Sequence, residues 1–208
     1  MFRPKSLLIV MTLVLAGALT ISLMAQAGPF KGHADLSGYQ EIPTLSSPAT
    51  GTADIQISKD GGSVSYALTY EGIGTNVRFA HIHLGRPAFS GSIMVFLCNN
   101  GAPPAGVPLP PACPQGSGTV SGTLSAADVG AGAASQGVAA GEFSEFVDAL
   151  RAEAAYVNVH SDAFPPGEIL WAGHLQPFGF SERQLARWCV RRFCMSEPPH
   201  GVESSVRA

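Results

Sequence analysis

The sequence predicts a mostly β protein, an antiparallel β-sandwich with Greek-key-like connections and one crossover helix. Several segments alternate apolar and polar residues with a period of two, which is typical of half-buried strands. Glycine (24 residues) and proline (16 residues) supply many turn positions in a chain of 208 residues. Charged residues make up 13% of the chain, against a usual share of about 25%. This composition disfavours long helices and coiled coils.

The individual elements follow from local periodicity. The clearest strand lies at 63–70, where apolar residues occupy every second position from Val64 to Tyr70, directly after a hairpin turn signal at 60–62. Phe143, Phe146 and Leu150 recur instead at helical spacing, which predicts an amphipathic helix. The predicted strands span 33–39, 51–58, 63–70, 77–84, 92–97, 118–124, 155–160 and 168–175, and the helix spans 142–153.

The N-terminal segment has the features of an export signal. A short basic stretch at 1–5 precedes an apolar run at 7–24, and Ala25 and Ala27 provide a small-x-small cleavage pattern. We therefore expect a signal peptide at 1–27, one domain at 28–178, and a secreted or periplasmic protein in a compartment that permits disulfides. An uncleaved anchor is the alternative, because an apolar run of about 18 residues can span a bilayer.

Residues 179–208 are predicted to form a C-terminal extension, a short basic helix followed by a disordered end. Ser181 is placed to cap that helix, and Arg183, Arg187 and Arg191 form a basic stripe along it. Such a helix either contacts an anionic membrane surface or packs on the acidic domain. Membrane contact is therefore expected only through an uncleaved signal or this tail helix.

The charge of the main body excludes one class of partner. Residues 28–180 carry five basic and twelve acidic residues. Nucleic-acid binding requires clustered lysine and arginine opposite the phosphates. We therefore expect no nucleic-acid partner.

Two of the four cysteines are predicted to pair. Cys98 and Cys113 bracket a stretch rich in proline and glycine that can form neither a helix nor a central strand. A disulfide across the base of this loop would stabilise the fold by about 3 kcal/mol in the chain-entropy model. Cys189 and Cys194 are not assigned a partner. The loop itself is the expected variable binding surface, with Asn99, Asn100, Pro103 and Pro104 as its candidate contact residues.

The histidines form the most specific chemical pattern. His81 and His83 are two apart on a predicted strand, so both imidazoles project from the same face. His160 lies on another predicted strand, and Glu168 and His174 share a face of the last one. If these strands are neighbours, His81, His83 and His160 converge with Glu168, or with His174, in a set of ligands suited to Cu or Zn.

A structural role is the alternative for these residues. In a buried polar network, each imidazole would bond a backbone carbonyl or Glu168 and so fix the register of the strands. Both hypotheses require the residues to lie close together, because buried polar side chains need partners. Neither a hydrolase nucleophile motif nor a dinucleotide-binding fingerprint occurs in the sequence.

Six short stretches, in this order and rough spacing, resemble the CHRD domain, a module named after chordin and also found alone in bacterial exported proteins. They are residues 36–43 (LSGYQEIP), 49–53 (ATGTA), 65–70 (SYALTY), 80–85 (AHIHLG), 156–160 (YVNVH) and 164–169 (FPPGEI). The resemblance covers about residues 31–175. It implies a β-sandwich-like extracellular module and no known catalytic residues.

Two functions are therefore expected as alternatives. The first is a non-enzymatic module of the cell exterior that binds a protein or matrix component through its loops. The second is a protein that binds Cu or Zn through the His-x-His strand, either with or without redox activity. The oligomeric state is not predicted.

Overall fold

The predicted fold class is confirmed by a computed structural model that describes residues 30–86, 89–102, 104–171 and 176–177. This part of the chain is mostly β, with an antiparallel sheet and one short α-helix. The strands are β1 (Lys31–Ser37), β2 (Thr50–Ile57), β3 (Val64–Glu71), β4 (Val77–Leu84), β5 (Ser92–Asn99), β6 (Gly118–Leu124), β7 (Ala155–Ser161), β8 (Ile169–Trp171) and β9 (Gln176–Pro177). The helix is α2 (Phe143–Arg151), and three 3-10 turns are η1 (Gly38–Gln40), η2 (Ala126–Asp128) and η3 (Ala131–Gln136).

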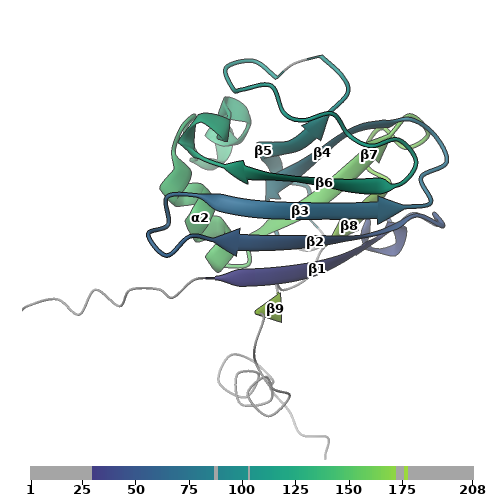
Figure 1. The fold of residues 1–208 in the computed structure, drawn as a ribbon, viewed down its shortest axis with the longest axis horizontal. Helices are drawn as coiled ribbons and strands as arrows, with labels where there is room; N and C mark the ends of the chain where they lie inside the picture. Colours follow the sequence, from purple (N-terminus) through teal and green to yellow (C-terminus); the bar gives the residue numbers. More distant parts are fainter. Residues whose placement is uncertain (1–29, 87–88, 103, 172–175, 178–208) are drawn as a thin grey trace, which may run out of the picture.

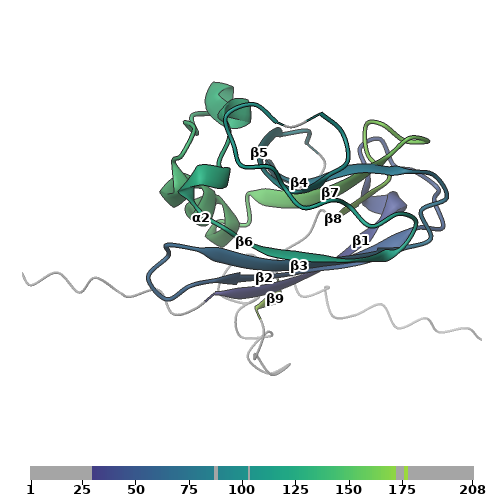
Figure 2. The same cartoon turned by 45° about the horizontal axis from the view of Figure 1, so that its top comes forward.

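The two layers of the sandwich are halves of one sheet. The strand order is β5-β4-β7-β8-β1-β2-β3-β6, and β9 pairs with β1. One layer holds β1, β2, β3 and β6, and the other holds β4, β5, β7 and β8 (Figures 1 and 2). The end strands β5 and β6 approach each other, so the sheet forms a nearly closed barrel. Across this seam the Tyr66 hydroxyl donates a hydrogen bond to the carbonyl of Leu97, at 2.6 Å.

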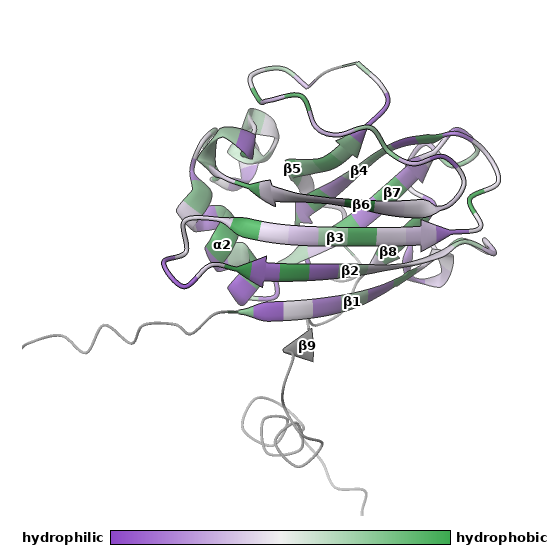
Figure 3. Cartoon of the chain, in the orientation of Figure 1, coloured by the Kyte–Doolittle hydropathy of each residue, from purple (hydrophilic) through white to green (hydrophobic). Residues whose placement is uncertain are grey.

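The core fills the interior of this barrel. Polar and apolar residues alternate along the strands of the front layer (Figure 3), so one face of each strand is buried and the other is wet. Val64, Leu68 and Tyr70 of β3 are almost completely buried, as their period-two pattern predicts. Helix α2 covers one end of the barrel with Phe146 and Leu150 (Figure 1).

The predicted disulfide between Cys98 and Cys113 is present, with a Cα–Cα distance of 5.0 Å. It closes the base of the loop between β5 and β6. The Asn100 side chain reinforces that base, because its amide donates to the carbonyls of Val77 and Cys113 and accepts the Cys113 N–H. The Asn99 amide donates within the loop, to the carbonyl of Ala102.

Several predicted features lie outside the described residues. They are the signal peptide at 1–27, the extension at 179–208 with Cys189 and Cys194, and the side chain of His174. Within the described part of the chain, no helix has the length and apolar character needed to cross a membrane.

Candidate metal centre

The three histidines lie on neighbouring strands and share one face of the sheet. In the β4–β7 ladder His81 is opposite Asn158, His83 is opposite Tyr156, and His160 is opposite Phe79. The alternate residues of both strands, such as Ala80 and Val159, pack into the barrel core. The imidazoles therefore project from the face that is turned away from the barrel interior.

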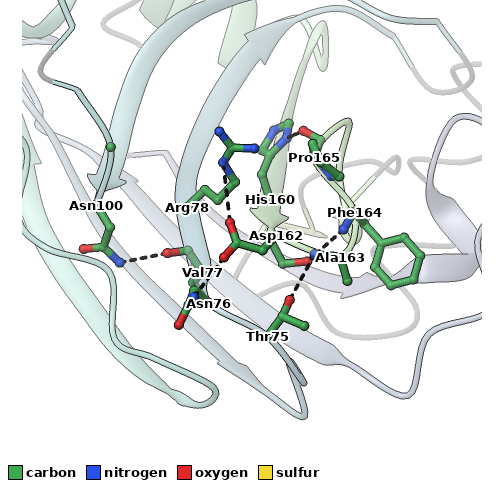
Figure 4. Close-up of polar contacts among 12 residues, drawn as sticks. Thr75, Asn76, Val77, Arg78, Asn100, His160, Asp162, Ala163, Phe164 and Pro165 are labelled. Atoms are coloured by element: carbon green, nitrogen blue, oxygen red, sulfur yellow. Dashed lines mark hydrogen bonds and ion pairs between the residues drawn. The ribbon is translucent and has the colours of Figure 1, made fainter.

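This outward face is nevertheless buried. Only 2% of the His81 surface and 7% of the surfaces of His83 and His160 are exposed. Two connections lie against the face. The β4–β5 loop brings the carbonyl of Gly91 to 3.0 Å from His83 Nδ1. The β7–β8 loop brings the carbonyl of Pro165 to 2.9 Å from His160 Nδ1, as Figure 4 shows.

The structure brings His81, His83 and His160 together. Each offers a ring nitrogen, and the three nitrogens lie within 4.8 Å of one another. Strand β4 carries His81 and His83, and strand β7 carries His160, so the cluster forms only when these two strands pair. This separation is close to what three ligands around one transition-metal ion require after a small inward movement of the rings.

Hydrogen bonds fix the tautomer of the His83 and His160 rings. A backbone carbonyl only accepts, so Nδ1 of His83 and of His160 must carry the proton. In a neutral ring this leaves the lone pair on Nε2. Within the described part of the chain both Nε2 atoms are buried without a hydrogen-bond partner, and so are both ring nitrogens of His81.

The electrostatics keep the rings neutral. Burial is the largest cause that lowers the pKa of His81, to about 2, with smaller contributions from His160 and His83. Burial also lowers the pKa of His160 to about 4, and it lowers the pKa of His83. A neutral imidazole with a free Nε2 lone pair is the form that binds metal ions.

Aromatic rings enclose the histidines and limit their rotation. Phe79 stacks on His81 with ring centroids 4.7 Å apart, and Phe96 meets the same ring edge-on at 4.3 Å. Tyr156 lies parallel to His83, with centroids 4.7 Å apart and planes inclined by 4°. These contacts exclude water from the cluster and hold the rings in place without using their nitrogens.

The carboxylate predicted for the site lies elsewhere on the same face. Glu168 is 3% exposed, but its carboxylate is not part of the group of nearby ligand atoms. Its Oε1 instead accepts the hydroxyl of Ser47 at 2.8 Å.

Two further buried polar residues, Glu41 and Asn158, were not among the site residues predicted from the sequence. Glu41 is 6% exposed and Asn158 is 5% exposed. Burial raises the pKa of Glu41 to about 7. Asn158 could have been recognised, because it alternates with His160 on one strand. Glu41 follows the η1 turn, where no periodicity indicates which way its side chain points.

Of the residues predicted to form a binding loop, Asn99 and Asn100 use their side-chain amides in the loop base. Pro104 lines a small cavity of about 230 Å³ beside β5, and Pro103 lies outside the described residues. A larger cavity of about 460 Å³ lies between residues 107–111 of this loop and strand β6.

Comparison with known protein families shows that residues 33–170 match the CHRD domain. Comparisons with curated proteins and with solved structures gave no match. The matched range begins in β1 and ends in β8, so it contains His81, His83, His160, Glu41 and both cysteines of the disulfide. The chain therefore belongs to the CHRD domain family.

Proposed function

We propose that this CHRD domain binds a transition-metal ion, zinc or copper, through the ring nitrogens of His81, His83 and His160. The observation that carries the proposal is the set of buried Nε2 atoms without a hydrogen-bond partner among the described residues. A buried polar atom left unpaired costs about 1–3 kcal/mol. One metal ion would satisfy all three rings at once.

The choice of metal follows from the donor set. Imidazole nitrogen suits zinc and copper, whereas calcium and magnesium require oxygen ligands. The Nδ1–H bonds from His83 and His160 to backbone carbonyls are the outer contacts that orient metal-binding histidines. Three such ligands leave one position of a tetrahedral ion for a further group.

The compartment in which the protein works is part of this proposal. The disulfide between Cys98 and Cys113 is consistent with an oxidising environment. Together with the signal-like features of residues 1–27, it supports a location in the periplasm or outside the cell. A metal site there draws on extracytoplasmic zinc or copper.

Metal content is the direct test. The protein, produced without a polyhistidine tag, should hold about one equivalent of zinc or copper. His83→Gln and His160→Gln should lose that ion and remain folded, since glutamine keeps a neutral polar side chain. His33→Gln, on the exposed side of β1, is the matched control and should keep the ion. A folded parent protein that takes up neither added Zn²⁺ nor added Cu⁺ would overturn the proposal.

A second candidate function is the binding of an extracellular protein or matrix component. It is favoured by the 460 Å³ cavity between residues 107–111 and β6, and by Leu109, which is 72% exposed at its rim. An apolar extended segment of a partner would fit between this loop and the strand. Leu109→Asp should abolish retention of the protein on cell-envelope material, whereas Lys59→Asp, in the β2–β3 hairpin and outside the residues that line the cavity, should not. Equal retention of both variants would refute this candidate.

A further inference from the structure

We infer that Glu41 is the carboxylate that serves the histidine centre, and that it acts on His81 through the side chain of Asn158. The inference rests on the proposed metal binding and assigns Glu41 and Asn158 as positioning residues. It gives the centre an anionic partner other than Glu168.

The argument begins with the unequal contacts of the three rings. His83 and His160 each donate Nδ1–H to a backbone carbonyl. His81 has no such contact among the described residues, because neither of its ring nitrogens has a partner. A metal-binding histidine nearly always gives its second N–H to a carboxylate, a carbonyl or a water. His81 therefore requires an acceptor on this face.

Asn158 is placed to supply that acceptor. It lies directly opposite His81 in the β4–β7 ladder. Side chains of directly opposed residues have Cβ atoms about 4.5–5.5 Å apart. Its Oδ1 is also buried without a hydrogen-bond partner in the described structure. A donor and an acceptor that both lack partners thus lie on opposed residues of two paired strands, and one bridging water would join them.

Glu41 lies beside the same amide. A Cβ built on Gly167 would be 2.6 Å from Glu41 Oε1 and 2.7 Å from both polar atoms of the Asn158 amide. The carboxylate and the amide therefore flank one point, and only a glycine leaves them room. Gly167 also has a φ of +146°, which further restricts this position to glycine. Glu41 Oε2 accepts the N–H of Ile42, whereas Oε1 has no partner among the described residues.

Charge balance supports the same assignment. None of the ion pairs between described residues involves Glu41, although the residue is 6% exposed. A buried carboxylate is costly unless a cation compensates it. Burial raises the pKa of Tyr156, the ring stacked on His83, and the charge of Glu41 adds a smaller contribution in the same direction. Three neutral imidazoles contribute no charge, so one carboxylate would balance half of the charge of a divalent ion.

Glu168 provides the matched control. It is an equally buried carboxylate on the same face, with one oxygen bonded to the Ser47 hydroxyl and the other without a partner among the described residues. It differs from Glu41 in position, because the oxygen that shares the space around Gly167 with the Asn158 amide belongs to Glu41. Glu41→Gln and Glu168→Gln remove the same charge and keep the same shape. If buried charge anywhere on this face determined metal affinity, both substitutions would weaken binding alike.

The test is a Zn²⁺ titration of the untagged protein against a chromophoric chelator. Glu41→Gln and Asn158→Ala should each weaken Zn²⁺ binding by about 10–100-fold, the usual effect of losing an outer contact. Glu168→Gln should stay within about threefold of the parent protein. Unchanged affinity in Glu41→Gln, or a larger loss in Glu168→Gln, would overturn the inference. A parent protein that does not bind Zn²⁺ or Cu⁺ would instead overturn the proposed function itself.

Thermal unfolding separates this role from a purely structural one. Without metal and at mildly alkaline pH, Glu41→Gln should raise the melting temperature, because it removes an uncompensated buried charge. With excess Zn²⁺ the same variant should gain less stability than the parent protein. A variant destabilised equally with and without Zn²⁺ would show that Glu41 serves only the fold.

Discussion

His83 and Tyr156 face each other across the β4–β7 ladder, and both hold Gly91 of the β4–β5 loop. The Nδ1–H of His83 donates to the Gly91 carbonyl at 3.0 Å, and the Tyr156 hydroxyl accepts the Gly91 N–H at 3.0 Å. The two rings are stacked. The position of this loop therefore determines which nitrogen of His83 is available to a metal ion.

The Tyr156 hydroxyl should contribute to stability through the hydrogen bond that it accepts from the Gly91 N–H. Tyr156→Phe keeps the stacked ring and leaves the Gly91 N–H without its acceptor. We expect the free energy of unfolding to fall by about 1 kcal/mol, the usual net value of such a bond. Urea denaturation measures the change, and Tyr39→Phe, at a tyrosine that is 71% exposed, is the control. Equal stability of Tyr156→Phe and the parent protein would contradict the assigned contact.

Gly91 should tolerate no side chain. A Cβ at this position would clash with the carbonyl of Leu84, so the loop would have to move away from His83. Gly91→Ala should lower the free energy of unfolding by about 2 kcal/mol or more and weaken metal binding. Gly74→Ala, where a Cβ meets no atom within 4 Å, should change stability by less than about 0.5 kcal/mol. The prediction fails if the two alanine variants are equally stable.

The metal-free protein should lose stability in acid because burial lowers the pKa of all three histidines, and His160 provides a part of this loss that can be measured. The unfolded chain takes up a proton on this residue below about pH 6.5, whereas the folded protein keeps it neutral until about pH 4. Between these values the unfolded state binds more protons, so stability falls as the pH falls, by up to about 1.4 kcal/mol per pH unit.

The variant His160→Gln isolates this contribution. Its free energy of unfolding should depend less steeply on pH between about 6.5 and 4 than that of the parent protein. Glu41 acts in the opposite direction, because its pKa is raised to about 7 in the folded state. That effect is common to both proteins and cancels in the difference. Parallel stability curves for the two proteins would show that His160 titrates normally in the fold.

The disulfide should be a major source of stability. Cys98 and Cys113 are 15 residues apart, and a loop of this size corresponds to about 3 kcal/mol. Cys98→Ala/Cys113→Ala should lose that amount in guanidinium denaturation. Reductant should destabilise the parent protein and leave this double variant unchanged. If the double variant matched the parent protein, hydrogen bonds such as those of the Asn100 side chain would be enough to hold the loop base.

The strands and the helix were largely predictable from the sequence because their alternation reflects a dry interior. The bounds of β4 and β6 match the predicted ranges, and those of the other long strands differ by one or two residues. The three 3-10 turns were not predicted, since they lack a repeating apolar pattern. The sequence also predicted two packed layers of strands. It did not predict that β1 pairs with β8 and so joins the layers into one sheet, because no local sequence pattern indicates that pairing.

The candidate site was less predictable than the fold. Because side chains alternate between the two faces of a strand, the sequence places His81 and His83 on one face. In the same way it shows which residues of the other strand share a face with His160. It does not reveal that β4 and β7 are neighbours. The burial of that face depends on two loops, around Gly91 and Pro165, that fold back over it. Glu41 reaches the face from a turn, and Glu168 is held by Ser47, so the partner carboxylate could not be chosen by spacing alone.

The pairing of β4 with β7 also has a consequence for the order of folding. His81 and His83 are separated from His160 by more than a third of the chain, including the disulfide loop and helix α2. Long-range contacts of this kind form late and slowly, because a large loop must close first. A partly folded chain would present only two of the three histidines of the centre. Acquisition of the ion would therefore mark the completion of the barrel, and its release would be an early sign that the barrel has opened.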